Sequence, residues 1–319
     1  MKISIIGAGS TYTPELIEGI GEGRLGTPLH DRVLMDVERG RLDILGGLAK
    51  RMLDKAGWSG RLTLTTSRDE ALDGPDACLV QYRIGGSAAR VKDESIPLPH
   101  GVLGQETVGP GGWAKALRTV PPTIEIAEAL AKSSPKAWLL DFANPVSMVS
   151  QALIGAGHRA VGLCNSAIGL QLLEMYRDPT LAEKPKLLES RGGAFYSAAA
   201  LDLIAALTGA RPARLVVNVR NDGAIPDLPD DQVIEVLSEV DATGARPIPI
   251  APLGGTRRDL ILKLGAFGKA TVAAALSGDR TAAIDALALN PLVPNRDVAE
   301  AIGGELLAAH AAHLPRFAR

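Results

Sequence analysis

Residues 2–12 read KISIIGAGSTY, and this stretch decides the fold. The apolar run from Lys2 to Ile6 ends at the glycine pair Gly7 and Gly9, and a second apolar run ends in Asp36. A strand, a glycine turn, a helix and a second strand ending in an acid form the start of a dinucleotide-binding fold. We therefore predict that the chain opens with a Rossmann-like unit.

Each residue of this unit has a physical role in nucleotide binding. Gly7 allows the strand to turn sharply, and Gly9 has no side chain to keep a pyrophosphate away. The helix that starts near Ser10 and Thr11 presents amide groups and the positive end of its dipole to that anion. Asp36 would accept hydrogen bonds from the ribose, which favours NAD over its 2′-phosphorylated relative.

The third glycine of the usual motif is Tyr12 here, so the glycine pair alone also fits a simple tight turn.

Composition narrows the class of protein. Of the 319 residues, 46% are apolar and 22% are charged, as in an ordinary soluble globular protein with room for two domains. The net charge of -2 gives no reason to expect a nucleic acid or an anionic membrane as partner. Two cysteines, Cys78 and Cys164, make no disulfide framework and favour the cytoplasm. No apolar stretch is expected to span a bilayer.

Apolar periodicity predicts the remaining elements of the first half. A helix is expected to begin with the Thr13 hydroxyl as its cap and Pro14 in its first turn. A second helix is expected over 39–56 and a third over 116–131, with a long glycine- and charge-rich loop over 90–112. Strands are expected over 62–65, 77–82, 137–142 and 160–163.

Polar residues follow three of these strands, where ligands of open α/β sheets bind. Arg83 is placed to hold an anionic group, although a solvated arginine has the same sequence signature. Asn144 is expected beside the nicotinamide. Cys164 follows the last strand and faces the cleft, which favours a functional thiol over a structural one; Cys78, inside a strand, is expected to be core.

The second half has a different pattern. An apolar helix is expected over 198–207, strands over 215–219 and 233–240, and mostly helix over 258–314. The fold class predicted is therefore α/β: a Rossmann-like, doubly wound, mostly parallel sheet plus a smaller α+β C-terminal domain. We place the NAD-binding domain at 1–171 and the substrate and oligomerisation domain at 172–319.

Several motifs together resemble glycoside hydrolase family 4, the NAD- and metal-dependent glycosidases. They are GAGSTYTPEL at 7–16, GQET at 104–107, GLCN at 162–165, RGGAFYS at 191–197 and NDGAIPDLP at 221–229. The resemblance covers nearly the whole chain. Cys164 followed by Asn165 looks like the 6-phospho-β-glucosidase branch.

The resemblance implies a mechanism that departs from the usual pair of carboxylates. NAD oxidises C3 of the sugar, a tyrosine removes the acidified C2 proton, the aglycone leaves by elimination, and water adds before the hydride returns. A divalent metal, expected to be Mn²⁺, stabilises the enediolate. The expected partners are a small phosphorylated glycoside and further copies of the chain in a homodimer or homotetramer.

The family's roles carry over to single positions. Tyr196 matches the base, Cys164 a metal ligand, and Asn144 and Asn165 substrate contacts. Arg83 and Arg258 match basic positions near the sugar phosphate. A tyrosine titrates near pH 10, so the base role requires a cation that lowers the pKa of Tyr196.

The family carries a segment between Gln171 and Leu172 that this chain lacks, and the metal-binding histidine lies in it. The resemblance therefore implies an incomplete metal site. Three readings stay open: a 6-phospho-β-glucosidase, a metal-free dehydrogenase resembling lactate and malate dehydrogenases, and an NAD-binding module without glycosidase activity.

Overall fold

The computed structural model describes residues 1–164 and 196–318, and nine strands of these residues form one sheet. The strands are β1 (Lys2–Ile6), β2 (Asp31–Met35), β3 (Arg61–Thr65), β4 (Ala77–Val80), β5 (Trp138–Asp141), β6 (Ala160–Gly162), β7 (Ala213–Arg220), β8 (Val233–Asp241) and β9 (Gly244–Pro247). Their order is β3-β2-β1-β4-β5-β6-β7-β8-β9.

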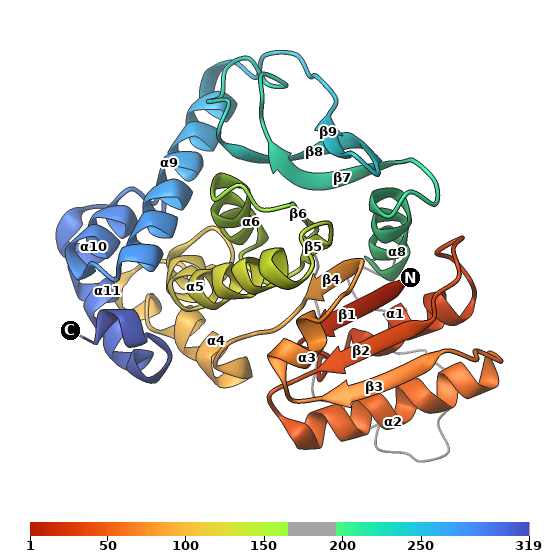
Figure 1. Cartoon of the computed structure of the whole chain (residues 1–319). Coiled ribbons are helices and arrows are strands. Elements are labelled where there is room, and N and C mark those ends of the chain that lie inside the picture. The colour runs from red at the N-terminus through yellow and green to blue at the C-terminus, as the bar shows by residue number, and fades with distance from the viewer. Residues whose placement is uncertain (165–195, 319) are drawn as a thin grey trace.

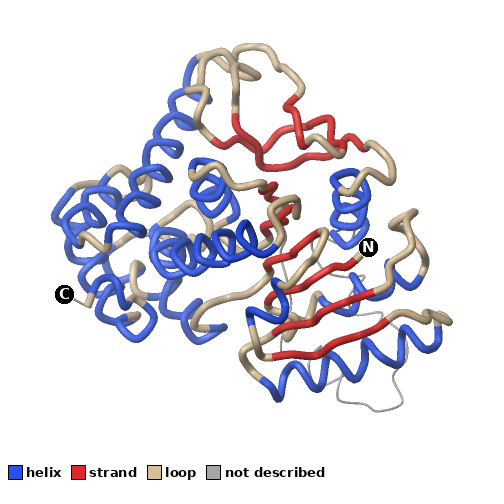
Figure 2. The backbone as a smooth tube through the Cα atoms, in the orientation of Figure 1, coloured by secondary structure: helices blue, strands red, loops and turns tan. Residues whose placement is uncertain are grey.

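Helices flank this sheet (Figures 1 and 2). They are α1 (Thr13–Gly21), α2 (Arg39–Lys55), α3 (Arg68–Leu72), α4 (Gly86–Ser95), α5 (Pro110–Ser133), α6 (Val146–Gly155), α8 (Tyr196–Leu207), α9 (Gly255–Ser277), α10 (Arg280–Ala288) and α11 (Arg296–Ala309). The short 3-10 turns are η1 (Leu98–His100), η3 (Ala311–His313) and η4 (Pro315–Phe317).

The first six strands are parallel to one another and have the doubly wound order of a Rossmann fold. The strands β7, β8 and β9 extend the same sheet in antiparallel pairing. The predicted fold class is confirmed, although the C-terminal strands continue the first sheet instead of forming a separate one. The boundary predicted at residue 171 lies outside the described residues.

The core divides into two layers because alternate strand residues point to opposite faces of the sheet. Ile3, Ile5 and Leu34 pack with α1, α2 and α8 on one face. Ile6 and Val33 pack with α3, α5 and the C-terminal helices on the other. Both faces are covered, which is why these strands are nearly continuous apolar runs.

The predicted loop over 90–112 is too long at both ends; residues 96–109 connect α4 and α5 and include only the 3-10 turn η1. Residues 86–95 form α4, and α5 begins at Pro110, six residues before the predicted start. The glycines there serve close packing: a Cβ on Gly112 would lie 2.2 Å from the Thr107 carbonyl oxygen. A glycine-rich sequence therefore indicates tight backbone contact here, not a long loop.

The predicted cap of the first helix is also wrong. Thr13 is the first residue of α1, and Tyr12 takes the cap position. The Thr13 hydroxyl donates to the Ala8 carbonyl at 2.8 Å and accepts from the Gln81 amide at 2.9 Å. Thr13 thus braces the glycine turn against the end of β4.

The helix α9 differs from the expectation that no apolar stretch could span a bilayer. It has 23 residues, and its most apolar window has a mean hydropathy of 1.4. Length and composition alone would allow it to cross a membrane. Core helices pass the same test, and Phe267, Val272 and Ala274 of α9 are buried in the core between α5 and α10.

Candidate active site

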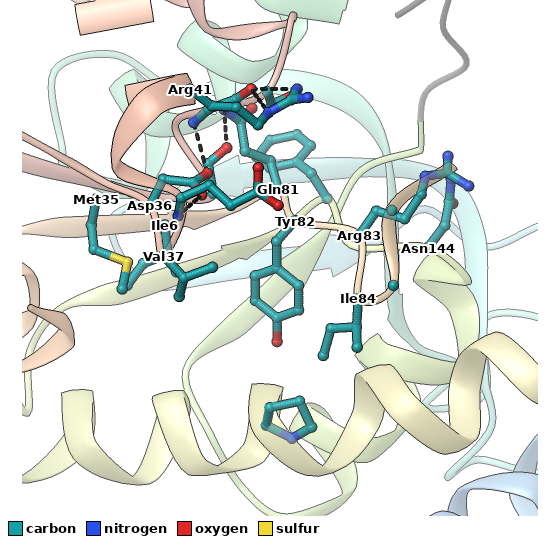
Figure 3. A pocket seen from close by; sticks show the side chains of 18 of the residues that line it. Ile6, Met35, Asp36, Val37, Arg41, Gln81, Tyr82, Arg83, Ile84 and Asn144 are labelled. Carbon is teal, nitrogen blue, oxygen red and sulfur yellow. Dashed lines mark hydrogen bonds between the residues drawn. The ribbon is translucent and has the colours of Figure 1, made fainter. Parts of the chain in front are cut away.

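A cavity of about 800 Å³ opens beyond the carboxyl ends of β1, β2, β4 and β5. In the close view, Asp36 and Arg41 lie toward one end and Arg83 and Asn144 toward the other (Figure 3). This is where open parallel sheets bind their ligands. The predicted residues Gly7, Gly9, Ser10, Thr11, Asp36, Arg83 and Asn144 all line it.

The glycine turn has the geometry predicted for it. Gly7 has φ of 86°, and a Cβ there would lie 2.9 Å from the Tyr82 nitrogen. A Cβ on Gly9 would lie 2.7 Å from Oδ2 of Asp36. Both positions therefore require glycine, one for its conformation and both for the close approach of neighbouring atoms.

Asp36 holds this turn as well as facing the cavity. Its Oδ2 accepts from the Gly9 amide at 2.8 Å, and its Oδ1 accepts from the Glu38 amide at 2.9 Å. Arg41 donates to the Gly9 carbonyl through Nη2 at 2.7 Å. Each carboxylate oxygen has further lone pairs, so Asp36 can still accept from a ribose hydroxyl.

The opposite end of the cavity carries positive charge. Arg83 Nη1 lies 2.9 Å from Glu106 Oε2, while Arg90 Nε and Lys115 Nζ each lie 3.3 Å from the same oxygen. We call these four residues the Glu106 cluster. Arg90 Nε also lies 2.7 Å from Glu94 Oε1. Three cations therefore face two carboxylates, and one positive charge remains while Lys115 is protonated.

Burial and charge shift the titration of this cluster. Burial, reinforced by the positive charge of Arg83, lowers the pKa of Lys115 to about 8. Burial alone would raise the pKa of Glu106, but the charges of Lys115, Arg83 and Arg90 outweigh it and lower that pKa. Glu106 is therefore ionised near neutral pH, while Lys115 is close to losing its proton.

The helix α4 begins beside this cluster and adds to the positive potential. Its cap residue Gly85 is left-handed, with φ of 80°, and offers no side chain to the first amides. Gly86 and Ser87 at its first turn line the cavity. Exposed amides and the helix dipole make such an end an anion site, here next to Arg83 and Arg90.

Asn144 is held at the tip of β5 by the buried Asp141. Asp141 accepts from the Ala143 amide at 2.9 Å and from the Ser150 hydroxyl at 3.0 Å. Burial raises the pKa of Asp141 well above its usual value. Asn144 lines the cavity, and its buried Oδ1 has no hydrogen-bond partner among the described residues.

Four predicted site residues are not brought into the cavity by the described structure. Cys164 is exposed directly after β6 and does not line the cavity. Arg258 lies in the exposed first turns of α9 and pairs with Asp259 at 3.0 Å. Asn165 lies outside the described residues, and Tyr196 is described only as the first residue of α8.

Within residues 1–164 and 196–318, no group of three or more histidine, cysteine, aspartate or glutamate side chains could hold a metal ion. The described residues therefore do not by themselves complete the metal site expected at Cys164.

Sequence reasoning missed Arg90, Lys115 and His313, which line the cavity, and Glu106, which pairs with Arg90 and Lys115. Glu106 lies in a motif that carries the resemblance, but the sequence alone assigned no role to it. Lys115 lies inside a helical run and His313 lies close to the C-terminus, so no local pattern connects them with Arg83.

Comparison with known sequences decides the family. Residues 2–176 match the family described as Family 4 glycosyl hydrolase, and residues 163–293 match its C-terminal domain. The chain belongs to glycosyl hydrolase family 4.

Two family relatives align over their whole length. A probable 6-phospho-beta-glucosidase of Bacillus subtilis is 33% identical over 432 residues, which cover 99% of this chain and 98% of the relative. A 6-phospho-beta-glucosidase of Escherichia coli is 30% identical, with coverage of 100% and 97%. The first alignment is longer than this chain of 319 residues, so the relative contains residues without a counterpart here.

Solved structures have the same fold. The 6-phospho-beta glucosidase of Thermotoga maritima, determined with NAD and glucose-6-phosphate, matches with a TM-score of 0.89 at 23% identity, covering 98% of this chain and 99% of that one. A malate dehydrogenase of Salinibacter ruber matches with a TM-score of 0.57 at 14% identity, covering 86% and 97%.

Proposed function

We propose that this protein hydrolyses 6-phospho-β-glucosides with NAD as its cofactor. The observation that carries the proposal is a single cavity that joins the Asp36 glycine turn to the positively charged Glu106 cluster. The family membership and the names of the two full-length relatives support the same substrate class.

The first end of the cavity fits the nucleotide. Gly7 and Gly9 leave room for a pyrophosphate, the amides of Ser10 and Thr11 lead into α1, and Asp36 accepts from the ribose. NAD bound there would accept a hydride from C3 of the sugar and return it after hydrolysis.

The second end fits the phosphate of the sugar. A phosphate monoester carries nearly two negative charges at neutral pH, and the cations of the Glu106 cluster attract them. Arg83 and Arg90 offer planar pairs of donors, and Lys115 offers a third cation from the cavity wall. Asn144 lines the cavity at the same end as Arg83 and is assigned to a hydroxyl of the sugar ring.

The remaining roles rest on the family resemblance. We assign removal of the C2 proton to Tyr196, a further sugar contact to Asn165, and the metal to Cys164. Arg258 was matched to a basic position near the sugar phosphate, but it lies outside the cavity and pairs with Asp259, so we assign no contact to it. The metal proposed is Mn²⁺, because a second structure of the Thermotoga maritima enzyme was determined with manganese, NAD+ and glucose-6-phosphate. Because the described residues do not complete its site, we derive no step through it.

The direct test is release of p-nitrophenol from p-nitrophenyl 6-phospho-β-glucoside with NAD, Mn²⁺ and a reductant. We expect Tyr196→Phe to abolish turnover and leave NAD affinity unchanged. Full turnover by that variant would remove Tyr196 from the base role. Cys164→Ser tests the metal assignment, because an unchanged Mn²⁺ titration would exclude the thiol as a ligand.

A second candidate is a family member that binds NAD and phosphosugar but has weak or lost glycosidase activity. The residues of the relative that have no counterpart here favour it. NAD and glucose 6-phosphate binding without turnover would distinguish this candidate from the first. Steady NADH formation from a hydroxy acid, insensitive to chelator, would instead indicate a dehydrogenase.

We further propose a cytoplasmic homodimer or homotetramer. Val216 and Leu237 form a cross-strand pair on β7 and β8, and both are about half exposed, at 51% and 46%. Leu260 of α9 is 48% exposed. Apolar surface of this kind is often covered by another subunit. Light scattering of the purified protein measures the oligomeric state.

A further inference from the structure

The C-terminal segment contributes a residue to the sugar end of the cavity. His313, in η3, lines the cavity together with Gly85 and Gly86. A Cβ on Gly85 would lie 3.1 Å from both Cδ2 and Nε2 of His313. The imidazole therefore lies against the Gly85 backbone, at the exposed amide end of α4.

A buried cluster fixes this segment to α4 and α5. Arg118 donates to Asp93 through Nη1 at 2.9 Å and Nη2 at 2.5 Å. His310 Nε2 lies 2.8 Å from Asp93 Oδ1, which is a charge contact and does not have the geometry of a hydrogen bond. These three residues form the Asp93 cluster. Their side chains are exposed by only 0%, 0% and 1% for Arg118, Asp93 and His310. His310 precedes His313 by three residues, so a fixed His310 restricts where His313 can lie.

The Asp93 cluster also contacts the turn before Gly85, against which His313 lies. Arg118 Nε donates to the Ile84 carbonyl at 3.1 Å, in the turn between Arg83 and Gly85. Lys92 Nζ of α4 donates to the Ala309 carbonyl at 3.1 Å, just before His310. The buried Asp93 cluster thus contacts both the Arg83 turn and the segment before His313, and the exposed Lys92 adds a second contact to that segment.

Burying three ionisable groups costs free energy unless they are paired. Even a paired buried cluster often stabilises a protein no more than apolar residues of equal size at the same positions would. Stability alone therefore does not explain the Asp93 cluster. We take its role to be holding the adjoining wall of the cavity in one precise geometry.

We propose that His313 is a substrate contact, donating a ring N–H to a phosphate oxygen of the bound phosphosugar, and that the Asp93 cluster positions it. This inference rests on the proposed function, because it takes the sugar phosphate to lie beside Arg83 and Gly86. Asp93, Arg118 and His310 are positioning residues; His313 alone touches the ligand.

The test is calorimetric titration of the NAD-loaded protein with glucose 6-phosphate. A hydrogen bond to a charged group contributes about 1.5–3 kcal/mol, so His313→Ala is expected to weaken binding by about tenfold or more. NAD affinity should not change. The matched control is His100→Ala: His100 pairs with Glu305 on the surface and does not line the cavity, so binding should match wild type.

Positioning is tested by His310→Gln alone and combined with His313→Ala. If His310 acts through His313, the double variant binds glucose 6-phosphate no more weakly than His313→Ala. Full additivity of the two losses would overturn the positioning role.

Different results would overturn the His313 contact and the proposed function. Wild-type protein that binds glucose 6-phosphate, together with a His313→Ala variant that binds equally well, overturns this inference and leaves the proposed function standing. NAD-loaded wild-type protein that binds no glucose 6-phosphate overturns both.

Discussion

Arg118 and Asp93 form a two-bond ion pair in which both side chains are completely buried. The protein contains a second fully buried arginine, Arg32 of β2, whose three guanidinium nitrogens have no hydrogen-bond partner among the described residues. Its guanidinium lies 4.0 Å from the ring centroid of Trp58, and burial lowers the pKa of Arg32 to about 9. Replacing each of these two arginines by methionine is therefore expected to change the free energy of unfolding differently.

We expect Arg118→Met to lower the free energy of unfolding by about 3–5 kcal/mol, because it leaves the Asp93 carboxylate buried without its main partner. Urea denaturation followed by circular dichroism measures this change. A loss below about 1 kcal/mol would contradict the view that the buried pair is a unit.

Arg32→Met should instead leave the free energy of unfolding within about 1 kcal/mol of wild type, or raise it. The substitution removes a desolvated charge that has only an aromatic face as partner among the described residues, and methionine fills a similar volume. The same urea experiment serves, with Arg118→Met as the matched comparison. A large loss would show that the Arg32 charge has a partner that outweighs its desolvation.

Gly9→Ala should abolish NAD binding. The new methyl group would stand 2.7 Å from Asp36 Oδ2 and 3.0 Å from Arg41 Cβ, so the turn that receives the pyrophosphate must open. Gly40→Ala is the control, because a Cβ at Gly40 in α2 meets nothing within 4 Å. Fluorescence titration with NADH compares the two; equal affinities would place the nucleotide elsewhere.

Glucose 6-phosphate affinity should fall as the pH rises through about 8. Lys115 carries its charge below that pH and loses it above, because burial has lowered its pKa. The phosphate stays a dianion over this range, so the change reports the protein. Lys115→Met should bind more weakly with little variation between about pH 7 and 10. A flat wild-type profile would exclude Lys115 from the phosphate site.

Thiol reagents should modify Cys164 and spare Cys78 in the native protein. Cys164 is exposed, whereas Cys78 is fully buried in β4 and burial raises the pKa of its thiol to about 12. One thiol should react with Ellman's reagent before urea is added and the second only after. Cys164→Ser should lose the first reaction, and its persistence would show that Cys78 is accessible.

Local sequence was sufficient for the Rossmann half of the molecule. The alternation of buried strands with amphipathic helices is set by residues close together in the sequence. The left-handed conformation at Gly7 is likewise set locally, by the turn that follows the first strand. Asp36 could be placed beside the glycine turn for the same reason, because the second strand of such a unit ends next to the first turn. The helices at the two ends of segment 90–112 could not be predicted. Its glycines are needed for close backbone contacts with Thr107 and Gln105, and those contacts form only when the chain folds.

The sequence by itself determined the glycine turn beside Asp36 and which family the chain belongs to. Only the tertiary structure decided the opposite end of the cavity, to which Arg90, Glu106, Lys115 and His313 come from four separate parts of the chain. The physical reason is that charges interact through space: Glu106 is ionised and Lys115 titrates near pH 8 because of neighbours that packing, not sequence order, brings within hydrogen-bonding distance.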